Sequence, residues 1–273
     1  MFIVNRSERP VMVFDRDGHF LYSFGEGFFK RAHGSYISRD GLFYCTDDEG
    51  HTVSKFTLDG KLLSTIGQPG KASDTGYEKK PTMSESIATI VRGAPPFNRP
   101  TGAALNSEGE IFVSDGYGNA RIHKFNPEGD LLLSWGEPGS KPGQFRLPHS
   151  VWIDKEDRVW ITDWQNNRIQ IFSDQGEFLE EWTDFAGPSD VFIDKEGKVY
   201  VSEEEWRISI LDDKGKLLGR WDSKGEPLEK ATFVAPHTIA VDSHGDIYVG
   251  EVSLAYRSFD KGPRTIQKFA RTT

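Results

Sequence analysis

The sequence predicts an all-β fold, a six-bladed β-propeller, and three observations support that prediction. A phrase of about forty residues recurs along the chain, and repeats of this period are typical of propellers and solenoids. Within each copy, β-branched and aromatic residues alternate between turns rich in Asn, Asp and Gly, which is the pattern of β-hairpins. No stretch has convincing helical periodicity. An irregular β-sandwich would not explain the recurrence.

The opening strand of the repeat is recognisable in five copies, and three further strands follow it in most of them. The five copies begin at Arg31, Arg99, Leu147, Gly187 and Ala235. The N-terminus supplies a sixth copy that lacks its first strand, because FIVNR, PVMVF and FLYSFG align with the second, third and fourth strands. Residues 1–273 are therefore expected to form a single propeller domain whose N-terminal blade is incomplete in this chain.

The loops of such a blade open on two opposite faces. Turns that join strands one to two and three to four are short and uniform, whereas loops that join strands two to three, or one blade to the next, vary in length. Variable loops are where functional residues concentrate. Two insertions, 68–97 and 253–264, fall on the variable face. They are expected to form a rim or lid over an active site.

Composition narrows the class of partner. The formal net charge of −9 opposes a nucleic-acid interface or attraction to an anionic membrane. The single cysteine, Cys45, excludes an intramolecular disulfide and suits a reducing compartment. The N-terminal segment MFIVNRSERP lacks the layout of a signal peptide. The sequence therefore predicts a soluble, cytoplasmic monomer that acts on a small-molecule or peptide-like substrate.

Three of the seven histidines occupy one position of the repeat, just before its innermost strand. They are His33, His149 and His237, in blades two, four and six, whereas Thr101 and Ser189 hold that position in blades three and five. Alternate blades of six are evenly spaced around the axis, so the three imidazoles are expected to converge. Three histidines with an open fourth position are typical of catalytic zinc sites. Iron, cobalt or nickel would also accept this set. The alternative is that each histidine bonds a neighbouring blade.

Two further residues on the same face are candidates for catalysis. Arg6 stands where the other repeats place Asp or Glu at the end of the second strand, which favours binding of a carboxylate or of developing charge. An ordinary surface arginine is the alternative. Tyr117 could act as a general base if the metal and Arg6 lower its pKa, and a rim aromatic is its alternative.

Five residues expected to lie near the three histidines are candidate substrate contacts. They are Trp164, Asp115, Asp163, Thr101 and Ser189. The acidic residues at the ends of second strands are also expected to accept hydrogen bonds from loop amides, which is a structural role.

The motifs RAHG, SDGYGNARI, LPHS, QNNRIQIF and APHT, taken together, resemble bacterial relatives of peptidyl-α-hydroxyglycine α-amidating lyase, an NHL-repeat propeller enzyme. The resemblance covers most of the chain. It implies that His33, His149 and His237 bind zinc, that Tyr117 is the base and that Arg6 assists. The implied reaction cleaves a carbinolamide into an amide and glyoxylate.

The chain departs from that family at several positions. Trp164 stands where the family has a second active-site arginine, and Thr238 replaces an aspartate that ligates calcium. The family's disulfide cysteines are also absent. These changes argue against a calcium site and leave a related small α-hydroxy compound open as substrate. Two other functions stay open: a metal-dependent hydrolase such as a lactonase, and a non-enzymatic NHL scaffold that binds a partner.

Overall fold

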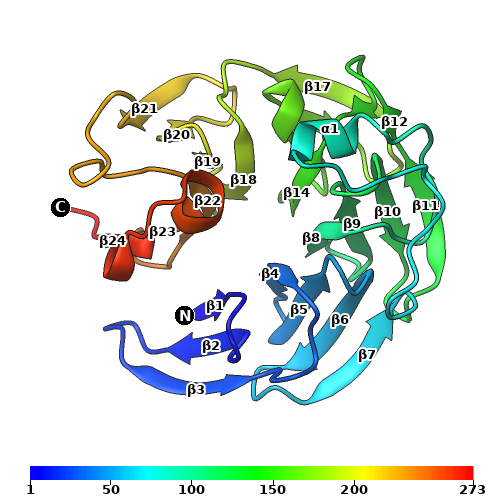
Figure 1. Ribbon diagram of the computed structural model, residues 1–273, viewed down its shortest axis with the longest axis horizontal. Coiled ribbons are helices and arrows are strands. Elements are labelled where there is room, and N and C mark those ends of the chain that lie inside the picture. The colour runs from blue at the N-terminus through cyan, green and yellow to red at the C-terminus, as the bar shows by residue number, and fades with distance from the viewer. Residues whose placement is uncertain (273) are drawn as a thin grey trace. The chain divides into compact units, whose positions relative to one another are not determined.

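The protein is described here by a computed structural model that covers residues 1–272 (Figure 1). The chain divides into two compact units, Met1–Ile153 and the segment from Asp154 onward. Both units consist almost entirely of antiparallel strands that are connected in sequence order.

The first unit contains the first three blades, followed by a short parallel pair of strands and one further strand. Its sheets have the orders β1-β2-β3, β4-β5-β6-β7 and β11-β10-β9-β8. The strands are β1 (Phe2–Val4), β2 (Val11–Phe14), β3 (Phe20–Phe24), β4 (Ala32–Ile37), β5 (Leu42–Asp47), β6 (Thr52–Thr57), β7 (Leu62–Ile66), β8 (Pro100–Leu105), β9 (Ile111–Asp115), β10 (Arg121–Phe125) and β11 (Leu131–Trp135). A short parallel pair, β12 (Glu137–Pro138) and β13 (Gln144–Phe145), precedes β14 (Pro148–Ile153), which packs beside β8.

The second unit repeats the same antiparallel succession. Its strands are β15 (Val159–Asp163), β16 (Arg168–Phe172), β17 (Phe178–Trp182), β18 (Pro188–Ile193), β19 (Val199–Glu203), β20 (Arg207–Leu211), β21 (Leu217–Asp222), β22 (Pro236–Val241), β23 (Ile247–Glu251) and β24 (Ile266–Phe269). The fifth blade has the order β18-β19-β20-β21, and the last has the order β22-β23-β24.

These groups of strands confirm the predicted six-bladed β-propeller. The N-terminal sheet β1-β2-β3 has three strands, and its segments are the three that the repeat register predicts. The register also holds at the histidines, because His33, His149 and His237 are each the second residue of the first strand of a blade, namely β4, β14 and β22.

The recurring turns are stabilised by one side chain, whose oxygen accepts hydrogen bonds from backbone N–H groups of the turn. Between β8 and β9, the Oδ1 atom of Asn106 accepts hydrogen bonds from the backbone N–H groups of Glu108 and Glu110, at 3.1 and 2.9 Å. Gly109 then takes a φ of 80°, in the left-handed region that glycine enters at little cost. The same arrangement recurs at Asp194 and Asp212 in the second unit.

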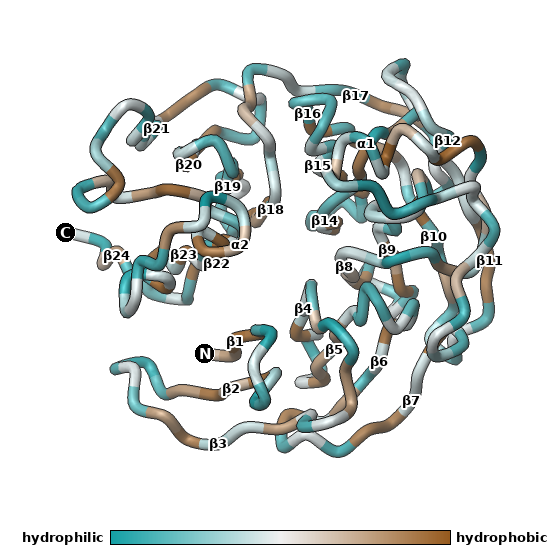
Figure 2. Tube along the Cα trace, viewed as in Figure 1, coloured by the Kyte–Doolittle hydropathy of each residue, from teal (hydrophilic) through white to brown (hydrophobic). Residues whose placement is uncertain are grey.

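Each unit buries aromatic and branched side chains between neighbouring sheets. One cluster in the first unit joins β2 to β5 and β6 and includes Val11, Phe43 and Phe56. In the second unit, Tyr200, Ile208 and Ile239 pack between the last two blades. Figure 2 shows hydrophobic segments along many strands, including the outermost strands β3, β7 and β11.

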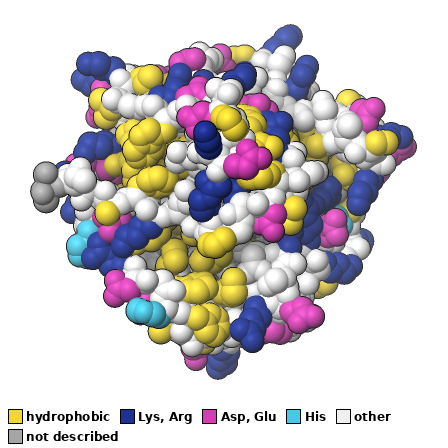
Figure 3. All heavy atoms as spheres, turned by 60° about the vertical axis from the view of Figure 1, so that its left-hand side comes forward, with side chains coloured by type: hydrophobic (Ala, Val, Ile, Leu, Met, Phe, Trp, Pro, Cys, Tyr) yellow, Lys and Arg dark blue, Asp and Glu magenta, His cyan; other side chains and the backbone are white. Residues whose placement is uncertain are grey.

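The outermost strands begin with two apolar residues that remain exposed. These pairs are Phe20–Leu21, Leu62–Leu63, Leu131–Leu132, Phe178–Leu179 and Leu217–Leu218. Figure 3 likewise shows hydrophobic side chains on the surface, interspersed with Lys, Arg, Asp and Glu. Across residues 1–272, no helix has the length and apolar character needed to cross a membrane.

Short helices in the loops depart from the expectation of a chain without helical stretches. They are α1 (Met83–Ile87), α2 (Ser253–Arg257), η1 (Trp164–Asn166) and η2 (Gly262–Thr265). None is long enough to show periodicity, but α1 has a sequence signature of its own. Thr82 and Glu85 form a capping box, in which each side chain accepts a hydrogen bond from the backbone N–H of the other.

Candidate active site

In the first unit, two of the predicted metal ligands lie beside the predicted base. The hydroxyl of Tyr117 is 3.0 Å from Nε2 of His33 and 2.9 Å from Nε2 of His149. The two imidazole rings are themselves 5.0 Å apart between centroids. His149 and Tyr117 are buried, and His33 is partly buried. Both imidazoles therefore direct the same nitrogen toward one point.

Two glycines permit close contacts near these side chains, one between β4 and β8 and the other between the loop after β9 and β14. A Cβ atom on Gly34 would lie 2.2 Å from the carbonyl oxygen of Thr101. A Cβ atom on Gly116, directly before Tyr117, would lie 2.0 Å from the carbonyl oxygen of Pro148. Both distances are shorter than any van der Waals contact. Glycine at position 34 therefore allows β4 to approach β8, and glycine at position 116 allows the Tyr117 loop to approach β14 beside His149.

The hydrogen bonds of His33 suit a metal ligand. Its Nδ1 lies 2.7 Å from the carbonyl oxygen of Thr101, which can only accept, so Nδ1 carries the proton. The neutral ring then offers the lone pair of Nε2 toward His149 and Tyr117. A backbone carbonyl on the second nitrogen is the usual partner of a metal-ligating histidine. The donor set in this unit therefore fits a divalent transition metal.

Guanidinium groups surround the tyrosine. The Cζ atoms of Arg31 and Arg99 lie 5.6 and 5.2 Å from the centre of the Tyr117 ring. Both arginines also donate to the same oxygen of Asp48, each at 3.0 Å, and that carboxylate is fully buried. Burial raises the pKa of Asp48, while Arg31, Arg99 and Arg6 oppose that rise.

Arg6 lies within electrostatic range of this cluster. Burial and the neighbouring Arg31 lower the pKa of the Arg6 guanidinium, whereas Tyr117 and Asp48 act in the opposite direction. Three guanidinium groups thus face one buried carboxylate and one phenol. The excess of positive charge makes this region suited to an anionic ligand.

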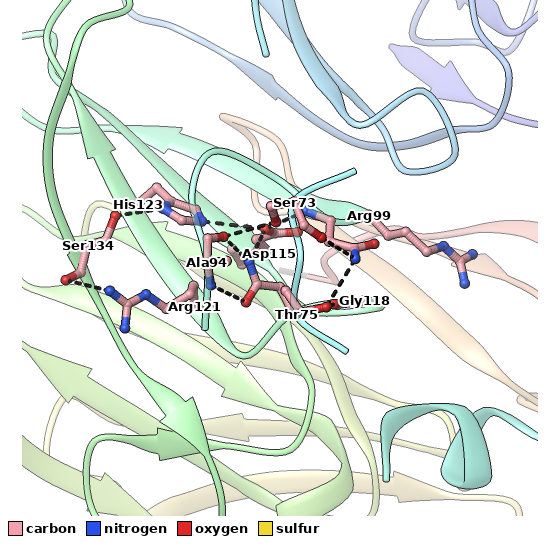
Figure 4. A network of polar contacts seen from close by, with 12 residues as sticks. Ser73, Thr75, Ala94, Arg99, Asp115, Gly118, Arg121, His123 and Ser134 are labelled. Atoms are coloured by element: carbon pink, nitrogen blue, oxygen red, sulfur yellow. Dashed lines mark hydrogen bonds and ion pairs between the residues drawn. The ribbon is translucent and has the colours of Figure 1, made fainter. Parts of the chain in front are cut away.

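The insertion 68–97 is attached to the loop that carries Tyr117. The hydroxyl of Thr75 donates to the carbonyl oxygen of Gly118 at 2.6 Å, and the Asn98 amide donates to Thr75 at 3.1 Å (Figure 4). Tyr77, also in the insertion, accepts a hydrogen bond at its hydroxyl from Arg99 at 2.8 Å. The insertion therefore supports the tyrosine and one of the two arginines above its ring.

Four of the predicted substrate contacts are buried and already hold other protein groups. Asp115 accepts from the backbone N–H of Asn98 at 2.8 Å, and its carboxylate also faces His123 (Figure 4). Asp163 accepts from Arg168 at 3.0 Å in the second unit. The hydroxyls of Thr101 and Ser189 lie 2.9 and 3.1 Å from carbonyl oxygens of the following blade. This geometry favours a structural role for all four.

The second unit places His237 beside a buried acidic residue. Its Nε2 lies 3.7 Å from Oε1 of Glu204, which follows β19. The helix α2, within the insertion 253–264, approaches the same loop, because Arg257 pairs with Glu205 at 2.9 Å. Trp164, the fifth predicted substrate contact, is partly buried and packs edge-on against Tyr256 of that helix, with ring centroids 5.9 Å apart.

Arg31 and Arg99 were not predicted as site residues. The two arginines share one repeat position, two residues before His33 and Thr101, and a comparison of that column would have revealed them.

One open groove of the second unit lies elsewhere. It has a volume of about 970 Å³ and is lined by β20, β21 and the last blade, with Tyr200, Trp221 and Phe269 among its residues. None of the predicted site residues lines it. It is therefore separate from the candidate active site.

The stability of the first unit is expected to fall as the pH decreases through about 6.5. The Nδ1 of His51 accepts the backbone N–H of Arg99 at 3.1 Å, and burial lowers the pKa of this imidazole. As the pH falls, His51 is therefore protonated in the unfolded chain before it is protonated in the folded protein. This difference favours unfolding at acidic pH. Urea denaturation at a series of pH values measures the effect. His51→Asn, which tolerates the observed φ of 58°, should have a weaker pH dependence; an unchanged dependence would contradict the assignment.

Comparison with known proteins gives the family. Residues 97–125 and 145–172 match the family described as NHL repeat. NHL repeat-containing protein 3 of Mus musculus is 30% identical over 292 residues, which cover 98% of this chain and 75% of that protein. Peptidyl-alpha-hydroxyglycine alpha-amidating lyase 1 of Drosophila melanogaster is 30% identical over 268 residues, covering 86% of this chain and 45% of that protein.

Solved structures support the fold. The structure described as a streptogramin B lyase superposes with a TM-score of 0.62 at 16% identity, covering 100% of this chain and 79% of that one. At this identity the likeness concerns the fold alone. Together with the repeat matches and the extended similarity to NHL repeat-containing protein 3, it leads to one conclusion: the chain belongs to the NHL-repeat family of β-propeller proteins.

Proposed function

We propose that this protein is a metal-dependent lyase that cleaves either a carbinolamide, such as an N-acyl-α-hydroxyglycine, or a related small α-hydroxy compound. The observation that carries the proposal is the position of the Tyr117 hydroxyl, 3.0 and 2.9 Å from the Nε2 atoms of His33 and His149. A phenol placed among metal-binding nitrogens and guanidinium groups suits removal of a hydroxyl proton from an anionic substrate.

His237 is proposed as the third ligand. It shares the repeat position of His33 and His149, and the three are a candidate set for one metal ion. Zinc suits a set of imidazoles, and iron, cobalt or nickel would also accept it. Bound there, the ion would supply Lewis-acid polarisation of the substrate oxygen.

The protein residues would move one proton and hold one charge. Tyr117, as phenolate, takes the hydroxyl proton of the carbinolamide, and that oxygen forms the carbonyl of glyoxylate. The C–N bond breaks, its electron pair passes to nitrogen, and the nitrogen gains a proton to give the amide. Arg6 and its neighbour Arg31 face the substrate carboxylate. The similarity to an amidating lyase supports this assignment.

The test combines metal analysis with a direct assay. Purified protein is expected to contain one divalent transition metal per chain and to release glyoxylate from N-benzoyl-α-hydroxyglycine, above the spontaneous rate measured with heat-denatured protein. Hydrolysis of lactones without glyoxylate release would indicate a hydrolase. A protein that binds no metal and releases no glyoxylate would instead be a scaffold, and the proposal would be abandoned.

A further inference from the structure

Three aromatic side chains gather on neighbouring loops of the second unit. Trp164 follows β15, Trp206 lies between β19 and β20, and Tyr256 belongs to helix α2. The ring of Trp164 meets that of Tyr256 edge-on, with centroids 5.9 Å apart. The Cζ atom of Arg257 lies 4.5 Å from the centre of the Tyr256 ring and 5.8 Å from that of Trp206. These three residues are called the aromatic cluster below.

The aromatic cluster lies close to the third predicted metal ligand. The backbone N–H of Val252, at the start of α2, donates to the carbonyl oxygen of Ala235 at 3.0 Å, two residues before His237. Burial raises the pKa of the Tyr256 hydroxyl to about 12, and the charge of Glu204 adds to that rise. Glu204 in turn lies 3.7 Å from Nε2 of His237 through its Oε1 atom. Helix α2 and its tyrosine are therefore neighbours of this histidine.

The insertion 253–264 is anchored by residues outside the aromatic cluster. The ammonium group of Lys261 donates to the carbonyl oxygen of Thr232 at 2.7 Å and pairs with the carboxylate of Glu251, and both charged side chains are fully buried. Tyr256, by contrast, is 38% exposed. Its backbone is thus held in place while part of the residue remains open to solvent. Such a preorganised aromatic contact costs little entropy when a ligand binds.

The charges around the aromatic cluster favour a neutral group over an anionic one. Arg257 already pairs with Glu205 at 2.9 Å, and Glu204 is the adjacent residue. A ligand carboxylate would therefore meet two glutamates and an arginine that is already paired. An aryl group meets no such opposition, and tyrosine and tryptophan rings bind another ring edge-on or in an offset stack.

We propose that the aromatic cluster binds an aryl group of the substrate, so that N-aroyl substrates are preferred over N-acetyl ones. In an N-acyl-α-hydroxyglycine, the acyl group is the apolar part, and it is therefore the part that these rings would contact. This inference rests on the proposed function in assigning the aryl group to a substrate of that reaction. It makes Tyr256 a specificity-determining residue and gives Trp164, a predicted substrate contact, a defined ligand chemistry.

The test compares two acids that share a carboxylate and an amide but lack the hydroxyl at which cleavage would begin. N-benzoylglycine and N-acetylglycine are titrated into the protein as purified, and their affinities are measured by calorimetry. N-benzoylglycine is expected to bind the wild type about tenfold more tightly, as ring contacts of this kind allow. Tyr256→Ala should reduce that preference to about twofold, whereas Tyr256→Phe, which keeps the ring, should retain it.

The matched control is Leu254→Ala. Leu254 is 63% exposed and lies on the same helix, two positions before Tyr256. At 3.6 residues per turn, two positions place the side chains on opposite sides of the helix. This variant also loses apolar surface from α2, but its preference for N-benzoylglycine should equal that of the wild type.

Equal affinity of the wild type for the two acids would overturn the assignment, and so would binding of neither acid or an unchanged preference in Tyr256→Ala. If Tyr256→Ala does not fold, a crystal structure of the wild type with N-benzoylglycine decides, and a benzoyl ring out of contact with Tyr256 and Trp164 overturns it. None of these measurements uses turnover. Glyoxylate release without the preference leaves the lyase function standing, whereas the preference without glyoxylate release ends the lyase function and leaves the aryl-binding site.

Discussion

His149→Ala is expected to lower glyoxylate release by roughly a thousandfold and to leave the protein without stoichiometric metal. His149 is 3% exposed, and its Nε2 is one of two nitrogens that converge on Tyr117. If loss of the metal removes about 4 kcal/mol of charge stabilisation at the reacting oxygen, the rate falls by about three powers of ten. Glyoxylate assays and elemental analysis of the same preparations measure both effects.

The matched control is His244→Ala. His244 lies in the turn between β22 and β23, with 61% of its side chain exposed, and it belongs to no site described above. This variant should keep its metal and its activity. If His149→Ala kept full activity, the metal mechanism would be wrong. A circular dichroism spectrum separates loss of metal from loss of fold.

Tyr117→Phe is expected to lower kcat by about 10²–10⁴, with little change in KM or metal content. The substitution removes the hydroxyl that lies 3.0 Å from His33 and 2.9 Å from His149 but keeps the ring beneath Arg31 and Arg99. Substrate binding through the guanidinium groups should therefore persist while proton removal fails. Steady-state kinetics over a range of substrate concentrations separates the two parameters.

Tyr77→Phe is the control for that experiment. Its hydroxyl accepts from Arg99 at 2.8 Å and is expected to affect binding more than kcat. If Tyr117→Phe retained kcat, another group would be the base. If instead it lost its metal, the hydroxyl would be acting as a ligand and the proposed division of roles would fail.

Much of the fold could be predicted because the repeat makes each strand predictable from its copies. The three-stranded first blade followed from aligning FIVNR, PVMVF and FLYSFG with the other repeats, and β1, β2 and β3 occupy those segments. The helix α1 could not be found by periodicity, because it spans only Met83–Ile87. The capping-box pair Thr82 and Glu85 is the feature of the sequence that indicates where this helix begins.

Part of the candidate site could be predicted from one repeat position. His33 and His149 were singled out because they share it, and the first unit brings both of them to Tyr117. Asp115 was a candidate substrate contact, but it also stands at a repeat position that is acidic in nearly every blade. In the structure, its carboxylate accepts a hydrogen bond from the backbone N–H of Asn98, which is a structural role.

Under the proposed function, the attachment of the insertion 68–97 to the loop of Tyr117 is expected to favour substrate affinity. Thr75 is fully buried and holds the carbonyl oxygen of Gly118, so this loop is ordered when the protein folds. Fixing a flexible residue costs roughly 1–2 kcal/mol of conformational entropy. A loop ordered only by substrate would subtract that amount from binding for each residue fixed. Under the proposed function, a tyrosine that is already ordered is expected to avoid this cost when the substrate binds.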